Sequence, residues 1–230
     1  MKKLTAFLIA LVLLLSLAAC AQEEVLTSHR RADRKIAVKE TTEVTEDETQ
    51  TDESDVDSKR GKFDGQTYEN TFLGIGCTLD RQWMYATPEE VEQIMAASGS
   101  AMGISGLSDE DVYYDMFAAT SEGYQISVTF SKDTYLTKKL SEEELLEASA
   151  DMLEYYIQSA GYENLQTGIE EFSFLDYDTK VLKVSADAYG RTLCEYIVTF
   201  RTQKHIVSIT VFAESEEACA QLIDQFYTLS

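Results

Sequence analysis

The chain has 230 residues, with 41 acidic and 19 basic side chains and a formal net charge of -22. Such a charge argues against a nucleic-acid-binding protein, because phosphates need a basic surface, and against a domain that lies flat on an anionic membrane. Two histidines, His29 and His205, are too few for a histidine-rich zinc site.

The first twenty residues carry the pattern of an export signal. Lys2 and Lys3 precede an apolar run over residues 6–17, which is shorter than the ~20 residues that a membrane-spanning helix needs. The run ends at Leu17-Ala18-Ala19-Cys20, which resembles the lipobox of bacterial lipoproteins. The resemblance implies cleavage before Cys20 and a diacylglyceryl thioether on its sulfur. The alternative is an ordinary cleaved signal in which Cys20 is incidental.

On the lipoprotein interpretation, residues 1–19 are a signal peptide and Cys20 is the lipidated N-terminus of the mature protein. Two acyl chains on Cys20 are enough for stable anchoring. We therefore expect a protein held at the extracytoplasmic face of the cell membrane by its N-terminal diacylglycerol.

Residues 20–65 have the composition of a charged tether. Thr, Glu and Asp dominate from Glu40 to Asp57, and Phe63 is the one aromatic residue of the segment. Because so little apolar surface can be buried, we expect disorder. The basic residues at the start of the tether could contact anionic lipid headgroups, or the tether could be a spacer whose charge is unevenly distributed. Five basic residues precede the acidic run, which contains none: Arg30, Arg31, Arg34, Lys35 and Lys39.

The folded domain is expected over residues 66–230, where aromatic and β-branched residues become frequent. Residues 67–71 predict a short strand. Residues 73–79 predict a second one, because apolar side chains stand at every other position.

A helix is predicted to begin after Thr87. Thr87 and Glu90 form a capping box, and Pro88 stands in the first turn, where its missing N–H does no harm. We expect this helix to end at Gly99, within a loop of small residues over 98–108.

A hairpin and a second helix come next. Residues 112–120 and 124–131 predict two antiparallel strands, the second of them half-buried. Ser141 and Glu144 form a second capping box, and the apolar residues that follow recur at helical spacing until Gly161.

The C-terminal part predicts mainly strands. Ser215 then caps a last helix with Glu216 and Glu217 in its first turn. The order β-β-α-β-β-α-β-β-β-β-α predicts an α+β fold, an antiparallel sheet packed by helices. The four strands before that helix are expected at residues 169–175, 179–188, 192–201 and 205–213.

The residues Tyr68-Glu69-Asn70-Thr71-Phe72-Leu73-Gly74-Ile75, followed by Trp83, resemble the opening of PsbP/Mog1-like proteins, a Tyr-x-Asn-x-x-x-Gly-aliphatic hairpin and then a tryptophan. The element order over residues 66–230 is similar as well. The resemblance implies an α-β-α sandwich that serves as an accessory or binding module and is generally non-enzymatic. The resemblance assigns no functional residue of the family to a position in this chain. The chain also lacks the proline that often stands shortly before the tryptophan.

Catalytic side chains are sparse. A Cys194/His205 dyad or a serine triad with His205 is formally available, but no G-x-S-x-G elbow accompanies it, so we favour a histidine without a catalytic task. Asp109-Glu110-Asp111 and Asp176-Tyr177-Asp178 could serve a paired-carboxylate hydrolase or a calcium site, although acids are ordinary in turns.

Tyrosines could form a stacking platform for a carbohydrate or a peptide. Adjacent tyrosines point to opposite faces of a strand, or about 100° apart on a helix, so we expect one of each pair to belong to the core. Packing is therefore the preferred interpretation. The tyrosines concerned are Tyr113, Tyr114, Tyr155, Tyr156, Tyr162 and Tyr177.

Three cysteines remain after Cys20: Cys77, Cys194 and Cys219. An exported protein permits disulfides, but three thiols cannot all pair with one another. Each stands on an apolar face of a predicted element, so we expect three reduced, buried thiols. If a bridge exists, Cys77–Cys194 is the favoured pair.

These observations favour a membrane-anchored cell-envelope lipoprotein whose domain is a non-enzymatic binding module. We expect no catalytic, cofactor or metal residues, no nucleic-acid partner, and an envelope protein or a small ligand as the bound species. The alternatives are a lipid-anchored hydrolase using acidic residues and a small solute-binding lipoprotein. The second is disfavoured because ~165 folded residues are few for two lobes.

Overall fold

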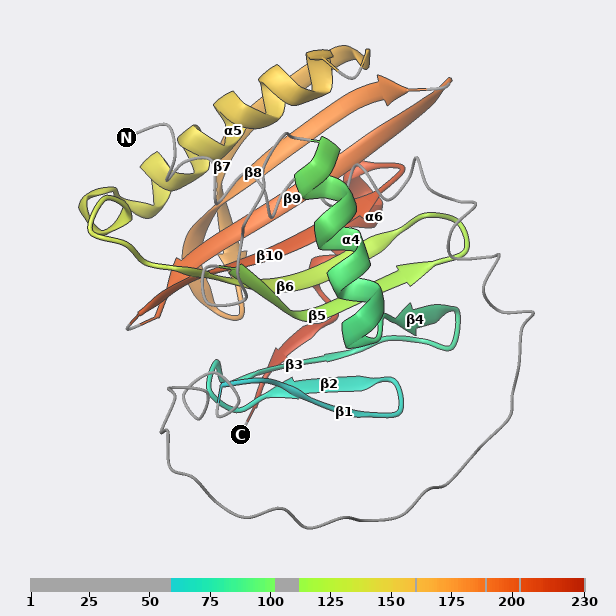
Figure 1. Cartoon of the computed structure of the whole chain (residues 1–230), viewed down its shortest axis with the longest axis vertical. Coiled ribbons are helices and arrows are strands. Elements are labelled where there is room, and N and C mark those ends of the chain that lie inside the picture. The colour runs from blue at the N-terminus through green and yellow to red at the C-terminus, as the bar shows by residue number, and fades with distance from the viewer. Residues whose placement is uncertain (1–58, 102–111, 160, 189, 203, 230) are drawn as a thin grey trace, which may run out of the picture.

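The computed structural model describes residues 59–101, 112–159, 161–188, 190–202 and 204–229. Cys20, the signal peptide and the acidic run of the tether lie outside these residues. Within them, two antiparallel sheets and three α-helices form an α+β fold, as the sequence predicts (Figure 1). None of the described helices is both long and apolar enough to cross a membrane.

The larger sheet holds most of the predicted strands. Its neighbours are antiparallel throughout, and the hairpins β5–β6, β7–β8, β8–β9 and β9–β10 follow the chain. In spatial order the strands are β4 (Trp83–Tyr85), β5 (Val112–Thr120), β6 (Gln125–Lys132), β10 (His205–Ala213), β9 (Arg191–Arg201), β8 (Tyr177–Ala188) and β7 (Glu163–Phe174).

The smaller sheet joins the N-terminal hairpin to the C-terminus. In spatial order its strands are β1 (Lys62–Asp64), β2 (Thr67–Asn70), β3 (Ile75–Thr78) and β11 (Phe226–Thr228). Gly74, with φ +69°, makes the turn between β2 and β3. A side chain on Gly76 would overlap the Tyr227 ring, which crosses β3 at that point.

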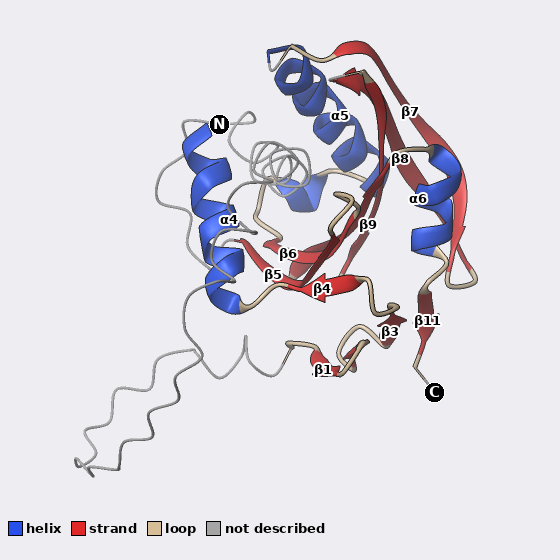
Figure 2. Ribbon diagram, turned by 90° about the vertical axis from the view of Figure 1, so that its right-hand side faces the viewer, coloured by secondary structure: helices blue, strands red, loops and turns tan. Residues whose placement is uncertain are grey.

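Helices cover both faces of the larger sheet (Figure 2). Helices α4 (Pro88–Ala101) and α5 (Glu142–Ser159) lie on one face, α4 over β5 and α5 over β7, β8 and β9. Helix α6 (Glu216–Ile223) and the smaller sheet lie on the other face. The main core therefore lies between the two sheets and α6.

The predicted helix starts are confirmed. Thr87 N donates to Glu90 at 2.9 Å and Glu90 N donates to Thr87 Oγ1 at 3.3 Å, so the first capping box is formed. The second is formed at Ser141 and Glu144, with bonds of 2.7 and 3.1 Å. Ser215 accepts from Ala218 N at the start of α6.

Several boundaries differ from the prediction. Gly99 does not end α4, which continues to Ala101; the rest of the predicted loop, 102–108, lies outside the described residues. Strand β7 begins six residues before the predicted start because an edge strand with alternating exposed polar residues gives a weak signal. The three-residue strands β1, β4 and β11 were not predicted, since three residues are too few to show alternation.

Strand β1 lies before Gln66, within the segment that the sequence analysis places in the tether. It pairs with β2 through Lys62↔Glu69 and Asp64↔Thr67. The chain is therefore part of the fold from Lys59 onward.

Candidate ligand-binding site

The residues with possible catalytic roles are not brought together. Cys194 pairs with Ala213 and Ile206 pairs with Arg201, so Cys194 and His205 lie at opposite ends of the β9–β10 hairpin. His205 contacts the rings of Tyr113 and Phe130 on the core side of the sheet, 6.4 and 5.7 Å between ring centroids. The structure therefore does not bring Cys194 and His205 together as a dyad.

The two acidic runs give no metal site in the described part of the chain. Asp109-Glu110-Asp111 lies outside the described residues, and no group of three His, Cys, Asp or Glu side chains with ligand geometry exists within them. The other run stands at the β7–β8 turn, whose left-handed residues are Leu175 and Asp176. The turn is thus Leu175-Asp176, whereas Tyr177 and Asp178, which were expected in the turn, belong to β8.

All three described cysteines are buried free thiols, which confirms the predicted burial. Burial raises the pKa of the Cys77 thiol to about 12. It also raises the pKa of Cys194 and of Cys219, where nearby acidic groups add to the effect. Cys219 Sγ donates to the Cys194 carbonyl oxygen at 3.3 Å. The thiols therefore act as small core side chains.

The tyrosines do not form one platform. Tyr113 and Tyr114 are both buried, against the expectation that one of each pair is core, because β5 is covered on both faces. Tyr155 and Tyr177 are exposed at separate places on α5 and β8, and Tyr162 packs beside α5. The side chain of Tyr156 lies outside the described residues.

The site that the structure does assemble begins at Asp115, a buried carboxylate in the middle of β5. The register of β5 against β6 shifts between Tyr114 and Met116, so Asp115 is the extra residue of a β-bulge. The bulge turns Asp115 towards the smaller sheet, while its side chain remains only 7% exposed. A buried carboxylate must be fully hydrogen-bonded to be tolerated.

Three donors from the smaller sheet and its approach satisfy Asp115. Tyr68 Oη donates at 2.5 Å, Asn70 Nδ2 at 2.7 Å, and Gly61 N at 2.9 and 3.0 Å to the two oxygens. Asn70 Oδ1 also accepts from Leu73 N at 2.8 Å. The Tyr-x-Asn-x-x-x-Gly motif therefore joins the two sheets and shapes the β2–β3 turn.

The Asp115 cluster has two further consequences. Burial, and then the charge of Asp115, raise the pKa of Tyr68 far above its usual range, so its hydroxyl stays a donor. Gly61 has to be glycine, because a Cβ there would overlap the Tyr68 ring. The segment that leads into β1 is held against β5 by the bonds of Gly61 N to Asp115.

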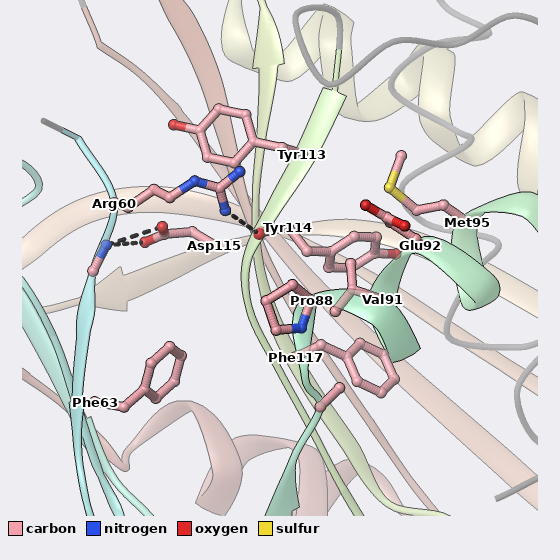
Figure 3. A pocket seen from close by; sticks show the side chains of 12 residues that line it. Arg60, Phe63, Pro88, Val91, Glu92, Met95, Tyr113, Tyr114, Asp115 and Phe117 are labelled. Carbon is pink, nitrogen blue, oxygen red and sulfur yellow. Dashed lines mark hydrogen bonds between the residues drawn. The ribbon is translucent and has the colours of Figure 1, made fainter. Parts of the chain in front are cut away.

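A cavity of about 230 Å³ lies beside this cluster, beneath α4 (Figure 3). Residues 60–63 form one wall, residues 86–95 the second and residues 113–117 of β5 the third. Its surface is mainly apolar and aromatic. The side chains that shape it include Phe63, Val91, Met95, Tyr114 and Phe117.

Polar groups stand at two sides of the cavity. The Arg60 guanidinium lies 4.9 Å from the centroid of the Tyr113 ring, and its Nη1 donates to the Tyr114 carbonyl oxygen at 3.5 Å. Glu92 stands on the α4 side. Burial, and then the charge of Glu195, raise the pKa of Tyr114, which stays a neutral wall of the cavity.

The sequence pattern does not predict this cavity. Its walls come from three separate stretches of chain, and only the sheet pairing brings them together. One feature of the sequence could have indicated the Asp115 cluster. Asp115 is the only charged residue in the run Val112–Thr120. A carboxylate in a strand buried on both faces needs hydrogen-bond partners from elsewhere in the chain.

A second hollow, of about 520 Å³, lies between the β7–β8 turn and β11. It is more open than the first, and its charged groups are the carboxylates of Asp176 and Asp224. It therefore offers less enclosure to an apolar group.

Comparison with known proteins gives structural likenesses only. No protein-family profile matches the chain, and no curated protein matches it in sequence. The structure is similar to PsbP (CyanoP) from Synechocystis sp. PCC 6803, with 12% sequence identity and a TM-score of 0.43, over 71% of this chain and 91% of that one.

It is also similar to LpqN, a protein involved in cell envelope biogenesis of Mycobacterium tuberculosis. Here the identity is 10% and the TM-score 0.35, over 68% of this chain and 83% of the other.

Proposed function

We propose that this protein is a lipoprotein of the cell envelope, anchored through Cys20, whose folded domain is a non-enzymatic binding module. The cavity beneath α4 carries the proposal, because it is more enclosed than the hollow beside β11 and has both apolar walls and polar rims. The apolar run and Leu17-Ala18-Ala19-Cys20 support the anchor.

Binding fits this site better than catalysis. Asp115 is buried and already accepts from Gly61 N, Tyr68 Oη and Asn70 Nδ2, so we assign it to joining the two sheets rather than to taking a proton from a reacting group. Glu92 is exposed on α4 and has no second free carboxylate opposite it among the described lining residues. The hydrolase alternative therefore lacks its pair of working acids.

The size of the cavity indicates the kind of ligand. Its volume of about 230 Å³ falls below the ~300–1,000 Å³ of pockets that enclose a whole drug-sized ligand. It suits one apolar or aromatic side chain of a protein partner, inserted between Val91, Phe117 and Phe63. Arg60 and Glu92 at the rims would then contact polar groups that flank the inserted side chain.

Affinity capture from solubilised envelopes tests the proposal. The bait is the intact protein, compared with Val91→Phe, which fills the cavity, and with Gln93→Phe, which adds the same side chain to an exposed position of α4. We expect a protein retained by the wild type and by Gln93→Phe to be lost with Val91→Phe. Equal retention by all three would exclude the cavity as the binding site.

A further inference from the structure

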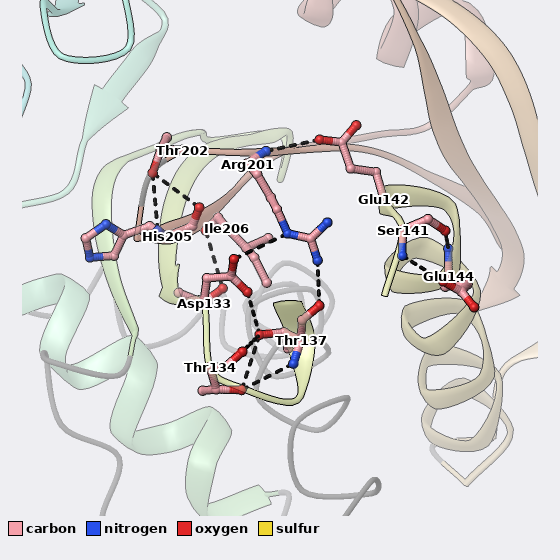
Figure 4. Close-up of polar contacts among 11 residues, drawn as sticks. Asp133, Thr134, Thr137, Ser141, Glu142, Glu144, Arg201, Thr202, His205 and Ile206 are labelled. Atoms are coloured by element: carbon pink, nitrogen blue, oxygen red, sulfur yellow. Dashed lines mark hydrogen bonds and ion pairs between the residues drawn. The ribbon is translucent and has the colours of Figure 1, made fainter. Parts of the chain in front are cut away.

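One polar cluster of the larger sheet is bonded within the fold. At the end of β6, Asp133 pairs with Arg201 Nε at 3.4 Å and accepts from Thr137 Oγ1 at 2.7 Å (Figure 4). Arg201 N donates to Glu142 Oε1 at 3.2 Å. These bonds join β9 to the 3₁₀ turn η3 (Thr137–Lys139) and to the start of α5. This cluster therefore serves the fold, whereas the edge of the smaller sheet beside the cavity has backbone groups left for a partner.

Strand β1 is an edge of the smaller sheet, and the neighbouring strands determine which of its backbone groups are bonded. Leu79 N donates to the Gln66 carbonyl oxygen at 2.9 Å, and these two residues stand opposite each other in the β2–β3 register. Hydrogen-bonded and non-bonded pairs alternate along an antiparallel ladder. The backbone groups of Tyr68 therefore face β3, and those of Thr67 and Glu69 face β1.

The backbone groups of Phe63 consequently point away from β2. Lys62 and Asp64 form the hydrogen-bonded pairs with β2, so the N–H and C=O of Phe63 lie on the outer edge. Gly61 N lies on the same edge, where it donates to Asp115. Neither backbone group of Phe63 has a hydrogen-bond partner among the described residues. Phe63 thus offers one donor and one acceptor at the edge that borders the cavity.

The ring of Phe63 indicates where a residue paired with it would place its side chain. Phe63 stands opposite the buried Tyr68, and the centroids of the two rings are 5.4 Å apart, so both rings lie on the core face of the smaller sheet. Opposite residues of neighbouring strands share a face, with Cα atoms ~5.5 Å apart in a hydrogen-bonded pair. A residue paired with Phe63 would therefore direct its side chain to the core face, beside the Phe63 ring that lines the cavity (Figure 3).

Two exposed charges flank Phe63 on the opposite face of the sheet. Side chains alternate along a strand, so Lys62 and Asp64 both point away from the core face. In an antiparallel strand paired with Phe63, the residue after the paired one would stand opposite Lys62, and the residue before it opposite Asp64. An acidic residue after and a basic residue before would give two cross-strand pairs of opposite charge.

We propose that the partner binds as an extended segment that pairs antiparallel with Phe63 and inserts an aromatic side chain, preceded by a basic and followed by an acidic residue, into the cavity beneath α4. This inference rests on the proposed binding function of the cavity. The pairing is short, because Asp115 already accepts the next outward N–H, that of Gly61. The inserted ring and the two flanking charges therefore supply the specificity, and the bonds to Phe63 fix the register.

Titration of residues 20–230 with Cys20→Ala, followed by amide NMR, tests the proposal with the peptide acetyl-Ser-Lys-Phe-Glu-Ser-amide. At millimolar peptide we expect the Phe63 and Val91 amide signals to shift and the Phe63 amide hydrogen, which gains an acceptor, to exchange more slowly. The charge-inverted peptide acetyl-Ser-Glu-Phe-Lys-Ser-amide has the same composition and should bind at least about threefold more weakly. A third peptide, with N-methyl-phenylalanine at the centre of the first sequence, cannot donate to the Phe63 carbonyl oxygen and should not bind.

Two protein variants separate this inference from the proposed function. Val91→Phe, which fills the cavity, should abolish peptide binding, and Gln93→Phe, at an exposed position of α4, should leave it unchanged. The strand pairing is overturned if no peptide shifts these signals, or if the charge-inverted or N-methylated peptide binds as tightly as the first. Equal binding of all three peptides that is lost with Val91→Phe would overturn the pairing and leave the cavity function intact. Binding that Val91→Phe leaves unchanged would overturn both.

Discussion

At the scale of single residues, Asp115 accounts for the way the two sheets are joined. One carboxylate on a bulge of β5 collects a hydroxyl, an amide and a backbone N–H from segments that precede it by about fifty positions. The sequence motif around Tyr68 and Asn70 thereby acquires a physical role, the joining of two sheets. The same bonds position Gly61 and the wall of the cavity.

Asp115→Ala should destabilise the protein by about 2–4 kcal/mol, because it leaves three buried donors without an acceptor. Tyr68→Phe removes one donor and should cost about 1–2 kcal/mol. Urea unfolding measures both. Asp151→Ala, at an exposed position on α5, is the control and should change stability by less than ~0.5 kcal/mol. An Asp115→Ala variant as stable as the control would contradict the role given to this cluster.

Thiol labelling tests the state of the cysteines. Cys77, Cys194 and Cys219 are buried, so the folded protein with Cys20→Ala should react slowly with a thiol reagent at neutral pH. After denaturation without reductant, three labels per chain are expected. Fewer than three would reveal a disulfide.

The raised thiol pKa values also predict a pH dependence. The folded state keeps Cys77 protonated up to a pKa of about 12, whereas the unfolded state releases this proton near 9.0. Above pH 9 the folded state therefore binds more protons, and the free energy of unfolding falls as the pH rises towards 12. Urea midpoints at pH 8 and pH 10.5 should show this decrease, and Cys77→Ala should lessen it. If the urea midpoint of Cys77→Ala fell equally between pH 8 and pH 10.5, Cys77 would not be a source of this pH dependence.

At the scale of elements, the strands and helix starts that depend on local sequence were predicted well. Alternation gave β5, β6 and β10 almost to the residue, and both capping boxes are formed. Strands β1, β4 and β11 could not be predicted, because three residues acquire strand geometry from their partners rather than from their own pattern. The cavity escaped prediction for the same reason: its walls meet only after the sheets have paired.

The N-terminal edge of the fold gives a prediction about truncation. A chain that begins at Gln66 lacks β1 and the Gly61 donor to Asp115, so it should be less stable than one that begins at Lys59, by about 1–3 kcal/mol. A chain that begins at Lys59 should have nearly the stability of one that begins at Ala21, because the removed segment has little apolar surface. Urea midpoints of the three chains decide this, and equal midpoints for Gln66 and Lys59 starts would show that β1 contributes nothing.

At the scale of the whole molecule, the proposed lipoprotein would extend outward from the membrane that holds Cys20. A basic stretch follows Cys20, an acidic stretch follows that, and the described fold begins at Lys59. In this proposal, the tether connects the anchor to the domain. Arg60 forms part of the wall of the cavity beneath α4, so the cavity lies close to the point at which the chain enters the described fold.

The anchor is the claim on which this arrangement depends, and fractionation of cells expressing the wild type or Cys20→Ala tests it most directly. Two acyl chains on Cys20 hold a protein stably on a bilayer, whereas the domain itself carries a charge that opposes adsorption. The wild type should therefore sediment with membranes, and Cys20→Ala should be recovered, still folded, in the soluble fraction. Membrane attachment of Cys20→Ala equal to that of the wild type would contradict the account.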